Sequence, residues 1–372
     1  MLKKISSRPQ KVYRSFDDVL IMPKFCSNST RDKRACLKTK LSDDISLHLP
    51  FISAAMDTVT ECDMALSMAL NGGIGCIHLN LSADEQVEII KKVKSYSADT
   101  RAYEHATLDA AGSLRLLTAV ESRLNKGRCD RVLEAGVDGI VIDTAHGHTS
   151  ACIETIKYIK SVKPECAVIA GNVVTCKAAS DLIDAGADSI KVGIGAGSIC
   201  ITRDVCGVGV PQFSAVIEVA KVCRRRGVTL ISDGGHRTTG DIAKAIGAGA
   251  NAVMLGNMLS SAEEAAGKTI TVKGKRYKSY RGMGSKDAIQ KSDRYHLEGG
   301  KAFVQGVSGL TAMDGKGVKE ILFNAAMGVK QAMFFSGVFT LDDFMENCTF
   351  IFITSNSALE GKAHSITMLE ES

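Results

Sequence analysis

The sequence predicts a single (β/α)8 barrel, and two observations on the chain support this fold. Short apolar runs recur along the sequence, each followed by an amphipathic stretch, as expected when helices connect the strands of a parallel sheet. A short internal repeat precedes three of these runs, at 135–138, 185–188 and 248–251, and each copy begins Ala-Gly. A glycine suits the end of a helix because it adopts the left-handed conformation at little cost. The repeated unit is therefore a helix, a glycine stop and a buried strand.

Eight strands are expected in chain order. A doubly wound sheet would also alternate strands and helices, but it more often places a glycine-rich dinucleotide fingerprint after its first strand. No such fingerprint follows the first apolar run, so the closed barrel is the favoured alternative. The expected strands cover residues 50–54, 73–78, 115–120, 139–143, 167–170, 189–193, 228–232 and 252–256.

Two segments lie outside the repeat. Residues 95–113 form a polar stretch before the third strand, and residues 264–312 form a long excursion after the eighth. A long loop at the carboxyl face of a barrel usually acts as a lid or flap. We therefore expect residues 1–372 to form one catalytic domain, with 95–113 as a short linker and 264–312 as an active-site excursion that includes a flap.

Composition and charge favour a globular protein that binds small anionic ligands. The 372 residues carry a formal net charge of +5, and the scattered lysines and arginines do not indicate a nucleic-acid surface. No apolar run approaches the length of a membrane span, and no signal-peptide core follows Met1. We therefore expect a cytoplasmic protein with no membrane association. The 12 cysteines lack the spacing of a zinc site and are expected to be reduced.

Polar and small residues follow the predicted strands at the ends where barrel enzymes place their active sites. Because these ends lie on one face of a barrel, the side chains should surround one site. They are Ser53, Met56, Asp57, His78, Asp143, Asn172, the loop 193–203, Asp233, Gly234, Gly235, Gly256 and Asn257.

The loop after the sixth predicted strand is the most informative of these segments. Its sequence over 193–202, Gly-Ile-Gly-Ala-Gly-Ser-Ile-Cys-Ile-Thr, lets backbone N–H groups approach an anion, and Ser198 adds a hydroxyl donor. Alternating glycines alone would be explained about as well by a tight turn. The glycines that end the seventh and eighth strands favour a phosphate site, which barrels often place there.

Cys200 lies within a few residues of this predicted phosphate site. A thiol among backbone N–H dipoles, with Lys191 or Arg203 nearby, is suited to act as a nucleophile. A loop cysteine that only fills space is the alternative, and it is the default explanation for the other eleven. Asp233, directly after an apolar strand, suits the hydroxyls of a ribose, but an N-cap for the following helix explains it equally well.

Several motifs in this order along the chain resemble those of the inosine-5′-monophosphate dehydrogenase family. The resemblance covers nearly the whole sequence, and so many independent motifs in the right order are not expected by chance. Besides 193–203, the motifs are Phe-Ile-Ser-Ala-Ala-Met-Asp-Thr-Val-Thr-Glu at 51–61, Asp-Thr-Ala-His-Gly-His at 143–148, Gly-Asn-Val-Val-Thr at 171–175, Ser-Asp-Gly-Gly at 232–235, Tyr-Arg-Gly-Met-Gly-Ser at 280–285 and Asp-Arg-Tyr at 293–295.

The resemblance implies an NAD-dependent enzyme that oxidises IMP to xanthosine 5′-monophosphate in guanine nucleotide synthesis. Cys200 then attacks the purine C2, hydride passes to the nicotinamide, and water hydrolyses the resulting thioimidate. Arg294 matches the flap arginine that activates this water, and Tyr295 lies beside it. Thr202 and Gln305 match residues that support hydrolysis.

The same resemblance implies binding roles for a larger set of residues. A potassium ion is implied as well, and its shared position between subunits requires an oligomer, which in this family is a homotetramer. Substrate-binding residues are Ser53, Met56, Ser198, Asp233, Gly234, Gly235, Gly256, Asn257, Tyr280, Met283 and Gly284. Cofactor-binding residues are Asp143, Thr144, Ala145, Asn172, Gly193 and Gly195, and the potassium ligands are Gly193, Gly195 and Cys200 with Glu360 and Gly361 of the neighbouring subunit.

The chain also departs from the family pattern. The CBS domain pair common in the family has no room in the short stretch at 95–113, so control through it should be absent. Ala54, Ala55 and Ala196 replace a serine and prolines, and Lys362 replaces a glycine near the cation ligands. Two alternatives stay open: a GMP reductase, whose members lack the Arg-Tyr pair, and an inactive nucleotide-binding scaffold.

Overall fold

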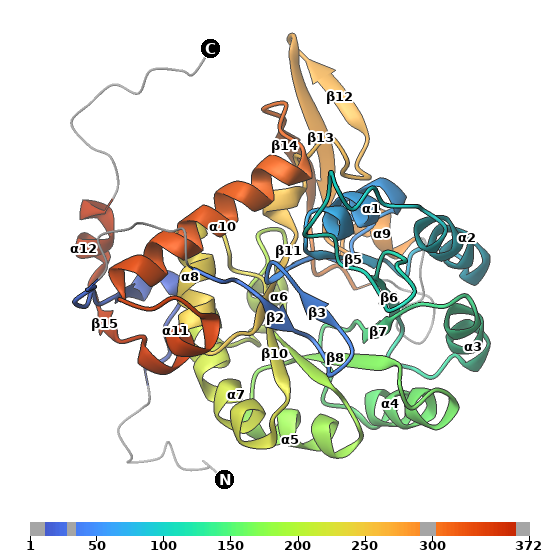
Figure 1. Ribbon diagram of the computed structural model, residues 1–372, viewed down its shortest axis with the longest axis horizontal. Helices are drawn as coiled ribbons and strands as arrows, with labels where there is room; N and C mark the ends of the chain where they lie inside the picture. Colours follow the sequence, from blue (N-terminus) through green and yellow to red (C-terminus); the bar gives the residue numbers. More distant parts are fainter. Residues whose placement is uncertain (1–11, 28–34, 291–302, 362–372) are drawn as a thin grey trace.

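Eight parallel strands close into a barrel in this computed structural model, which describes residues 12–27, 35–290 and 303–361 (Figure 1). The strands pair in chain order, and the last pairs with the first to close the barrel. The (β/α)8 barrel and all eight predicted strands are therefore confirmed. The strands are β4 (Phe51–Ser53), β5 (Ile74–Ile77), β6 (Leu116–Val120), β7 (Gly139–Ile142), β8 (Ala167–Val173), β9 (Ser189–Val192), β10 (Thr229–Asp233) and β11 (Ala252–Leu255).

Helices surround the barrel, and local sequence signals begin and end them. Ser82, Thr149, Thr175 and Thr238 each cap a helix by accepting a backbone N–H hydrogen bond. The predicted glycine stops have φ values of +87°, +110° and +113° at 136, 186 and 249, a region that favours glycine. The surrounding helices are α1 (Cys62–Leu70), α2 (Ala83–Lys94), α3 (Lys126–Glu134), α4 (Ser150–Val162), α5 (Cys176–Asp184), α7 (Gln212–Arg226), α8 (Thr239–Gly247) and α10 (Val318–Phe335).

A short hairpin closes the amino end of the barrel. It consists of β2 (Thr39–Lys40) and β3 (Ser46–Leu47), which pair antiparallel. Leu41, Ile45 and Leu47 are buried together with apolar side chains of the strands, such as Ile52 and Ile74. The hydroxyl of Thr229 donates a 2.8 Å hydrogen bond to the Leu41 carbonyl. The interior is therefore filled at this end, and the carboxyl end is left for a site.

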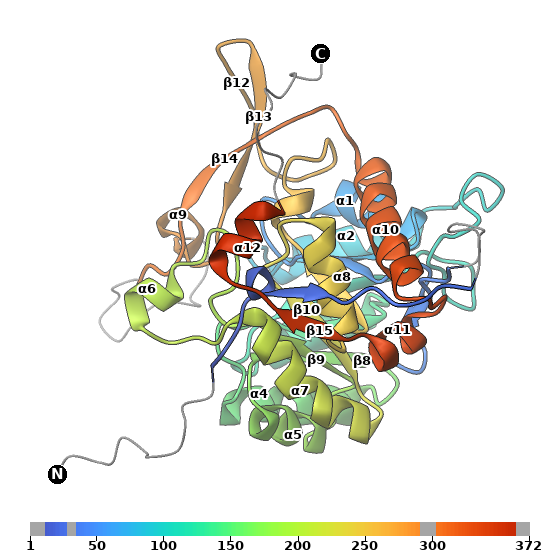
Figure 2. The same cartoon turned by 90° about the vertical axis from the view of Figure 1, so that its left-hand side faces the viewer.

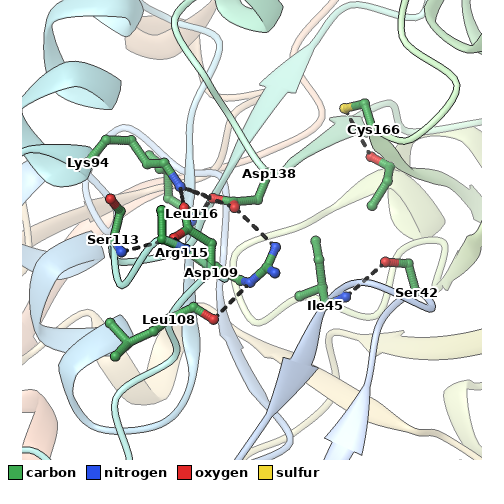
Figure 3. Close-up of polar contacts among 12 residues, drawn as sticks. Ser42, Ile45, Lys94, Leu108, Asp109, Ser113, Arg115, Leu116, Asp138 and Cys166 are labelled. Carbon is green, nitrogen blue, oxygen red and sulfur yellow. Dashed lines mark hydrogen bonds and ion pairs between the residues drawn. The ribbon is translucent and has the colours of Figure 1, made fainter. Parts of the chain in front are cut away.

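A network of charged side chains fixes the connection between α2 and β6, which contains the stretch 95–113 that we predicted to be a short linker (Figure 3). Lys94 of α2 lies 2.7 Å from Asp109 and 3.1 Å from Asp138. Arg115 lies 3.1 Å from the other oxygen of Asp138 and donates to the Leu108 carbonyl. Asp138 is only 6% exposed, so this short connection is tied to a buried carboxylate that two cations share.

The excursion after β11 contains a second, antiparallel sheet. Its strands are β12 (Thr269–Val272), β13 (Lys275–Arg281) and β14 (Ser308–Ala312), and β13 is the central one. This sheet projects away from the barrel, as Figures 1 and 2 show. The short helix α9 (Lys286–Ile289) lies between β13 and β14 in the sequence.

The remaining elements lie towards the chain ends. β1 (Val19–Ile21) pairs antiparallel with β15 (Phe350–Phe352) and so joins the two ends of the described chain. Within the described ranges, no helix is both long and apolar enough to cross a membrane. The other elements are the 3-10 helices η1 (Phe16–Asp18) and η2 (Asn257–Leu259) and the helices α6 (Thr202–Cys206), α11 (Leu341–Asn347) and α12 (Ser355–Glu360).

Candidate active site

Two adjoining cavities open at the carboxyl ends of the barrel strands. Their volumes are about 180 Å³ and about 260 Å³, and they share lining residues that include Asp233 and Tyr280. Among the predicted site residues, the first is lined by Met56, Asp143, Thr144, Ala145, Asn172, Gly193, Gly195, Cys200, Thr202, Asp233, Gly234, Tyr280, Met283, Gly284 and Gln305. The second is lined by Met56, Ser198, Asp233, Gly234, Gly235, Gly256, Asn257 and Tyr280.

Ser53 is the one predicted substrate residue in the described chain that lines neither cavity. It is fully buried in β4, and its hydroxyl accepts a 2.8 Å hydrogen bond from Thr60. Asp57 also lies apart from the cavities, because Arg281 and Asn80 bind its carboxylate. Burial acts to raise the pKa of Asp57, but these hydrogen bonds outweigh it and hold that pKa below its usual value. The Ser53 hydroxyl is therefore bonded within the barrel, and Asp57 joins the barrel to the base of the excursion.

The loop that carries Cys200 depends on glycine at its first position. Gly193 has φ +147°, and a Cβ there would lie 2.1 Å from the Asp233 carbonyl oxygen, so no other residue fits. Beyond this turn the loop pairs with the segment that returns from the excursion. Ile201 donates to the Gln305 carbonyl at 2.9 Å, and Val307 donates to the Ile199 carbonyl at 3.0 Å. The loop around Cys200 is therefore held from both sides.

Cys200 belongs to a short chain of polar side chains. Its Sγ lies 3.1 Å from the Thr202 hydroxyl, which donates to the Gln305 side-chain oxygen at 3.0 Å. With its proton committed to Gln305, the hydroxyl can accept from the Cys200 thiol. The three side chains predicted to act in one reaction are thus brought together at the wall of the first cavity.

The two cations predicted near Cys200 have different surroundings. Arg203 interacts electrostatically with Cys200, and its guanidinium donates to the carbonyls of Ile194 and Val210. In the described chain, Lys191 makes its hydrogen bonds to other residues and none to Cys200, which corrects that half of the prediction. Its ammonium is buried among carboxylate and amide oxygens at the ends of neighbouring strands instead.

The second cavity is lined by several glycines and by hydroxyl-bearing side chains, which are groups that a phosphate site can use. Ser198 hydrogen bonds to Tyr280, whose pKa burial raises to about 12, so the phenol stays a neutral donor. Gly234 and Gly235 have φ values of +90° and +84°, which favour glycine. Gly256 lies close to Tyr280, since a Cβ there would be 3.1 Å from the phenol oxygen. The wall of this cavity thus combines these two hydroxyl groups with glycine backbone that a phosphate can approach closely.

Gln212 and His236 also line the second cavity, and neither was predicted. The Gln212 amide donates to the Val192 carbonyl at 2.8 Å and to the Asp233 carbonyl at 3.2 Å, so it joins the ends of β9 and β10. His236 Nε2 lies 3.0 Å from the Ser232 hydroxyl. Neither residue ends a strand or belongs to a recognisable motif, so only the folded chain identifies them.

A third cavity adjoins the first at Asp143 and Thr144. Its volume is about 1090 Å³, and it lies over the carboxyl ends of β5 and β6. Glu121 and Arg128 line it and form a 3.1 Å ion pair. A ligand longer than one nucleotide could therefore extend from the first cavity into this one.

Several predicted residues cannot be described or lie apart. Arg294, Tyr295 and Lys362 fall outside the described residues. Glu360 ends helix α12 and Gly361 is its C-cap, and neither lines any of the cavities described above. Among residues 12–27, 35–290 and 303–361, no group of three or more His, Cys, Asp or Glu side chains could hold a metal ion.

Comparison with known proteins supports the predicted family over nearly the whole chain. Residues 14–364 match the family described as IMP dehydrogenase / GMP reductase domain. The chain is 39% identical to the inosine-5′-monophosphate dehydrogenase of Borreliella burgdorferi, over 96% of this chain and 99% of that protein. It is 32% identical to the enzyme of that name from Chlorobaculum tepidum and 34% identical to one from Staphylococcus aureus, in each case over 96% of this chain and 97% of the relative.

The lengths of these alignments bear on the domain content. The alignment with the Chlorobaculum protein spans 480 residues, whereas this chain has 372, so that relative carries a long stretch without a counterpart here. This difference agrees with the expected lack of a CBS domain pair. Since nearly all of its length is shared with these relatives, the chain belongs to the IMP dehydrogenase / GMP reductase family.

Proposed function

We propose that this chain oxidises IMP to xanthosine 5′-monophosphate with NAD⁺, through a covalent intermediate on Cys200, in guanine nucleotide synthesis. One observation carries the proposal: Cys200, backed by Thr202 and Gln305, lines a cavity that adjoins a second cavity whose glycines and hydroxyl groups suit a phosphate. The name shared by the three relatives supports the same substrate.

The first half-reaction places the purine C2 at the Cys200 sulfur. The sulfur bonds to C2, the thiol proton leaves, and C2 gives up its hydride to the nicotinamide, which forms a thioimidate and NADH. A thiol fits this role because its sulfur is a strong nucleophile once it is deprotonated. The glycine loop carries this thiol to the wall of the first cavity, where a purine could reach it.

The second half-reaction returns the enzyme to its starting state. Water adds to C2 and the C–S bond breaks, which yields xanthosine 5′-monophosphate and the free thiol. We assign activation of this water to Arg294, with Tyr295 beside it, on the family resemblance. Thr202 and Gln305 would orient the water or the intermediate, since Thr202 hydrogen bonds to Cys200 and Gln305 accepts from Thr202.

The nucleotide would span the two smaller cavities. Asp233 lines both of them and would accept hydrogen bonds from the ribose, which favours this role over a helix cap because α8 is capped by Thr238. Ser198 and Tyr280, with the N–H groups of Gly235 and Gly256, would bind the 5′-phosphate. Gly234, Asn257 and Met56 complete the walls, and Met283 with Gly284 would hold the base.

The dinucleotide would lie on the side of Asp143. Thr144, Ala145, Asn172, Gly193 and Gly195 line the first cavity there. The adjoining large cavity gives the rest of the molecule space to extend. This arrangement would place the nicotinamide beside the purine and close to Cys200.

A potassium ion and a homotetramer are implied by the family, and the described residues fit the ion only in part. Carbonyl oxygens suit a large monovalent cation, but the Gly193 carbonyl already accepts a 2.6 Å hydrogen bond from Asn172. The guanidinium of Arg203 donates a hydrogen bond to the carbonyl of Ile194, the next residue. No chemical step proposed above depends on the ion. We infer only that a cation bound to Gly195 and Cys200, with Glu360 and Gly361 of a neighbour, would stabilise the loop in a cytoplasmic homotetramer.

Two assays test the function and its alternatives. Incubation with IMP and NAD⁺ should produce NADH absorbance at 340 nm in proportion to enzyme. If the protein instead oxidises NADPH in the presence of GMP and does not reduce NAD⁺ in the presence of IMP, it is a GMP reductase. If IMP raises the melting temperature while neither assay gives a signal, the protein is a binding scaffold.

A further inference from the structure

We propose that Lys191 is a positioning residue for ribose recognition, which holds one carboxylate oxygen of Asp233 so that the other faces the substrate. The inference rests on the proposed function, because the ribose belongs to the nucleotide assigned above. It concerns a residue that lines neither of the two nucleotide cavities. Lys191 therefore acts on the substrate through Asp233 rather than by contact.

The ammonium of Lys191 lies at the junction of several strands. The side chain belongs to β9, which lies between β8 and β10 in the barrel, and it is 1% exposed. Its Nζ is 2.7 Å from Asp233 Oδ2 and 2.9 Å from Asp143 Oδ1, and it also donates to the Asn172 side-chain oxygen. An ammonium has three N–H donors, and three acceptors surround this one.

Asp233 is held through one oxygen only. Its Oδ2 receives the hydrogen bond from Lys191 and a second, at 2.9 Å, from the Asn172 amide. Its backbone carbonyl accepts from Gln212 at 3.2 Å. In the described part of the chain, no donor is bonded to Oδ1, and the side chain is 22% exposed at the cavity wall. One oxygen is thus an anchor and the other is an acceptor for ligand hydroxyls.

The charge arrangement explains why a cation is needed at this position. Burial alone would lower the pKa of Lys191, but attraction to Asp143 and Asp233 raises it above its ordinary value. Without the ammonium, the two carboxylates would face each other in a buried site with no cation between them. Asp233 would then turn towards solvent, and its ribose-facing geometry would be lost.

Ribose discrimination tests this role more directly than activity alone. We would measure kcat/KM with NAD⁺ for IMP and for 2′,3′-dideoxy-IMP, which lacks both ribose hydroxyls, in the wild type, Lys191→Met and Lys191→Arg. Hydrogen bonds to a carboxylate should make the wild type prefer IMP by about 10- to 100-fold. Lys191→Met should reduce that ratio about tenfold, mainly by slowing IMP, and Lys191→Arg should keep it within about threefold of wild type.

The possible outcomes distinguish a positioning role of Lys191 from a general loss of active-site structure. A merely structural role would slow both substrates in parallel, so a ratio in Lys191→Met within about twofold of wild type overturns the proposal. If circular dichroism shows that Lys191→Met does not fold, Lys191→Gln is measured against the same criterion. A wild type that forms no NADH from IMP would instead overturn the proposed function, which keeps the two failures distinct.

Discussion

His236 makes the stability of the protein depend on pH in a way that one substitution can isolate. Its ring is 7% exposed, stacks on Phe16 with centroids 5.6 Å apart, and is 3.0 Å from the Ser232 hydroxyl. Burial disfavours the charged imidazolium and lowers the pKa of His236 from 6.5 to about 4, although the carboxylates of Asp233 and Asp241 act in the opposite sense. The folded protein therefore keeps this ring neutral well below pH 6.5.

The size of the effect follows from the two pKa values. The pKa is lower in the folded state than in the unfolded chain, so the stabilisation is present above pH 6.5 and is lost as pH falls through 4. One pKa unit corresponds to about 1.4 kcal/mol. His236 should therefore reduce the free energy of unfolding by about 2 kcal/mol at pH 5 and by about 3 kcal/mol at pH 4, relative to pH 7.5.

Urea unfolding of the wild type and His236→Leu between pH 7.5 and pH 4 measures this term. Leucine has no titrating group, and the Ser232 hydroxyl keeps the Gln212 amide as a partner at 3.2 Å. The advantage of the wild type over the variant should shrink by about 2 kcal/mol between pH 7.5 and pH 5. His146→Leu, at an exposed position, is the control and should leave the pH profile unchanged. A constant difference between wild type and His236→Leu at every pH would refute the reasoning.

The remaining predictions concern the covalent chemistry and the short connection before β6. Cys200→Ala should abolish NADH formation while IMP still raises the melting temperature; any turnover comparable to wild type would contradict the role of the thiol. Arg294→Ala should keep a stoichiometric NADH burst in stopped flow but slow the steady state, and loss of the burst as well would show that the half-reactions are not divided as proposed. Asp138→Ala should cost about 3–5 kcal/mol in urea unfolding because it leaves Lys94 and Arg115 partly buried without their shared carboxylate, whereas Asp184→Ala, which breaks an exposed pair with Arg226, should cost less than about 1 kcal/mol. Equal losses in these two variants would contradict the account of the connection.

Much of the barrel could be predicted because its signals are local. Each strand is a short apolar run, and the glycine that ends a helix stands next to it in sequence, as at Gly136. The strand ends were less predictable, since β8 continues to Val173 and carries Asn172 within it. That extension is set by pairing with β9 across a register shift, which no single segment reveals.

Site residues could be predicted where the chemistry requires a particular residue type at the end of a strand. They were harder to predict where a side chain's hydrogen-bond partners are distant in sequence. Cys200 and Asp233 follow strands and line the cavities as predicted. The partners of Lys191 are 19 to 48 residues away in sequence, so its place could not be predicted from neighbours. Ser53 shows the converse, because its hydroxyl ends a strand yet bonds inward to Thr60.

Mass spectrometry of the trapped intermediate tests the central chemical claim most directly. The full-length protein would be mixed with IMP and NAD⁺, quenched in acid within one turnover, digested and sequenced. The account predicts a mass increase equal to the oxidised nucleotide on the peptide that carries Cys200, absent from Cys200→Ala and absent without NAD⁺. The same mass on another residue, or unmodified Cys200 while NADH accumulates, would contradict it.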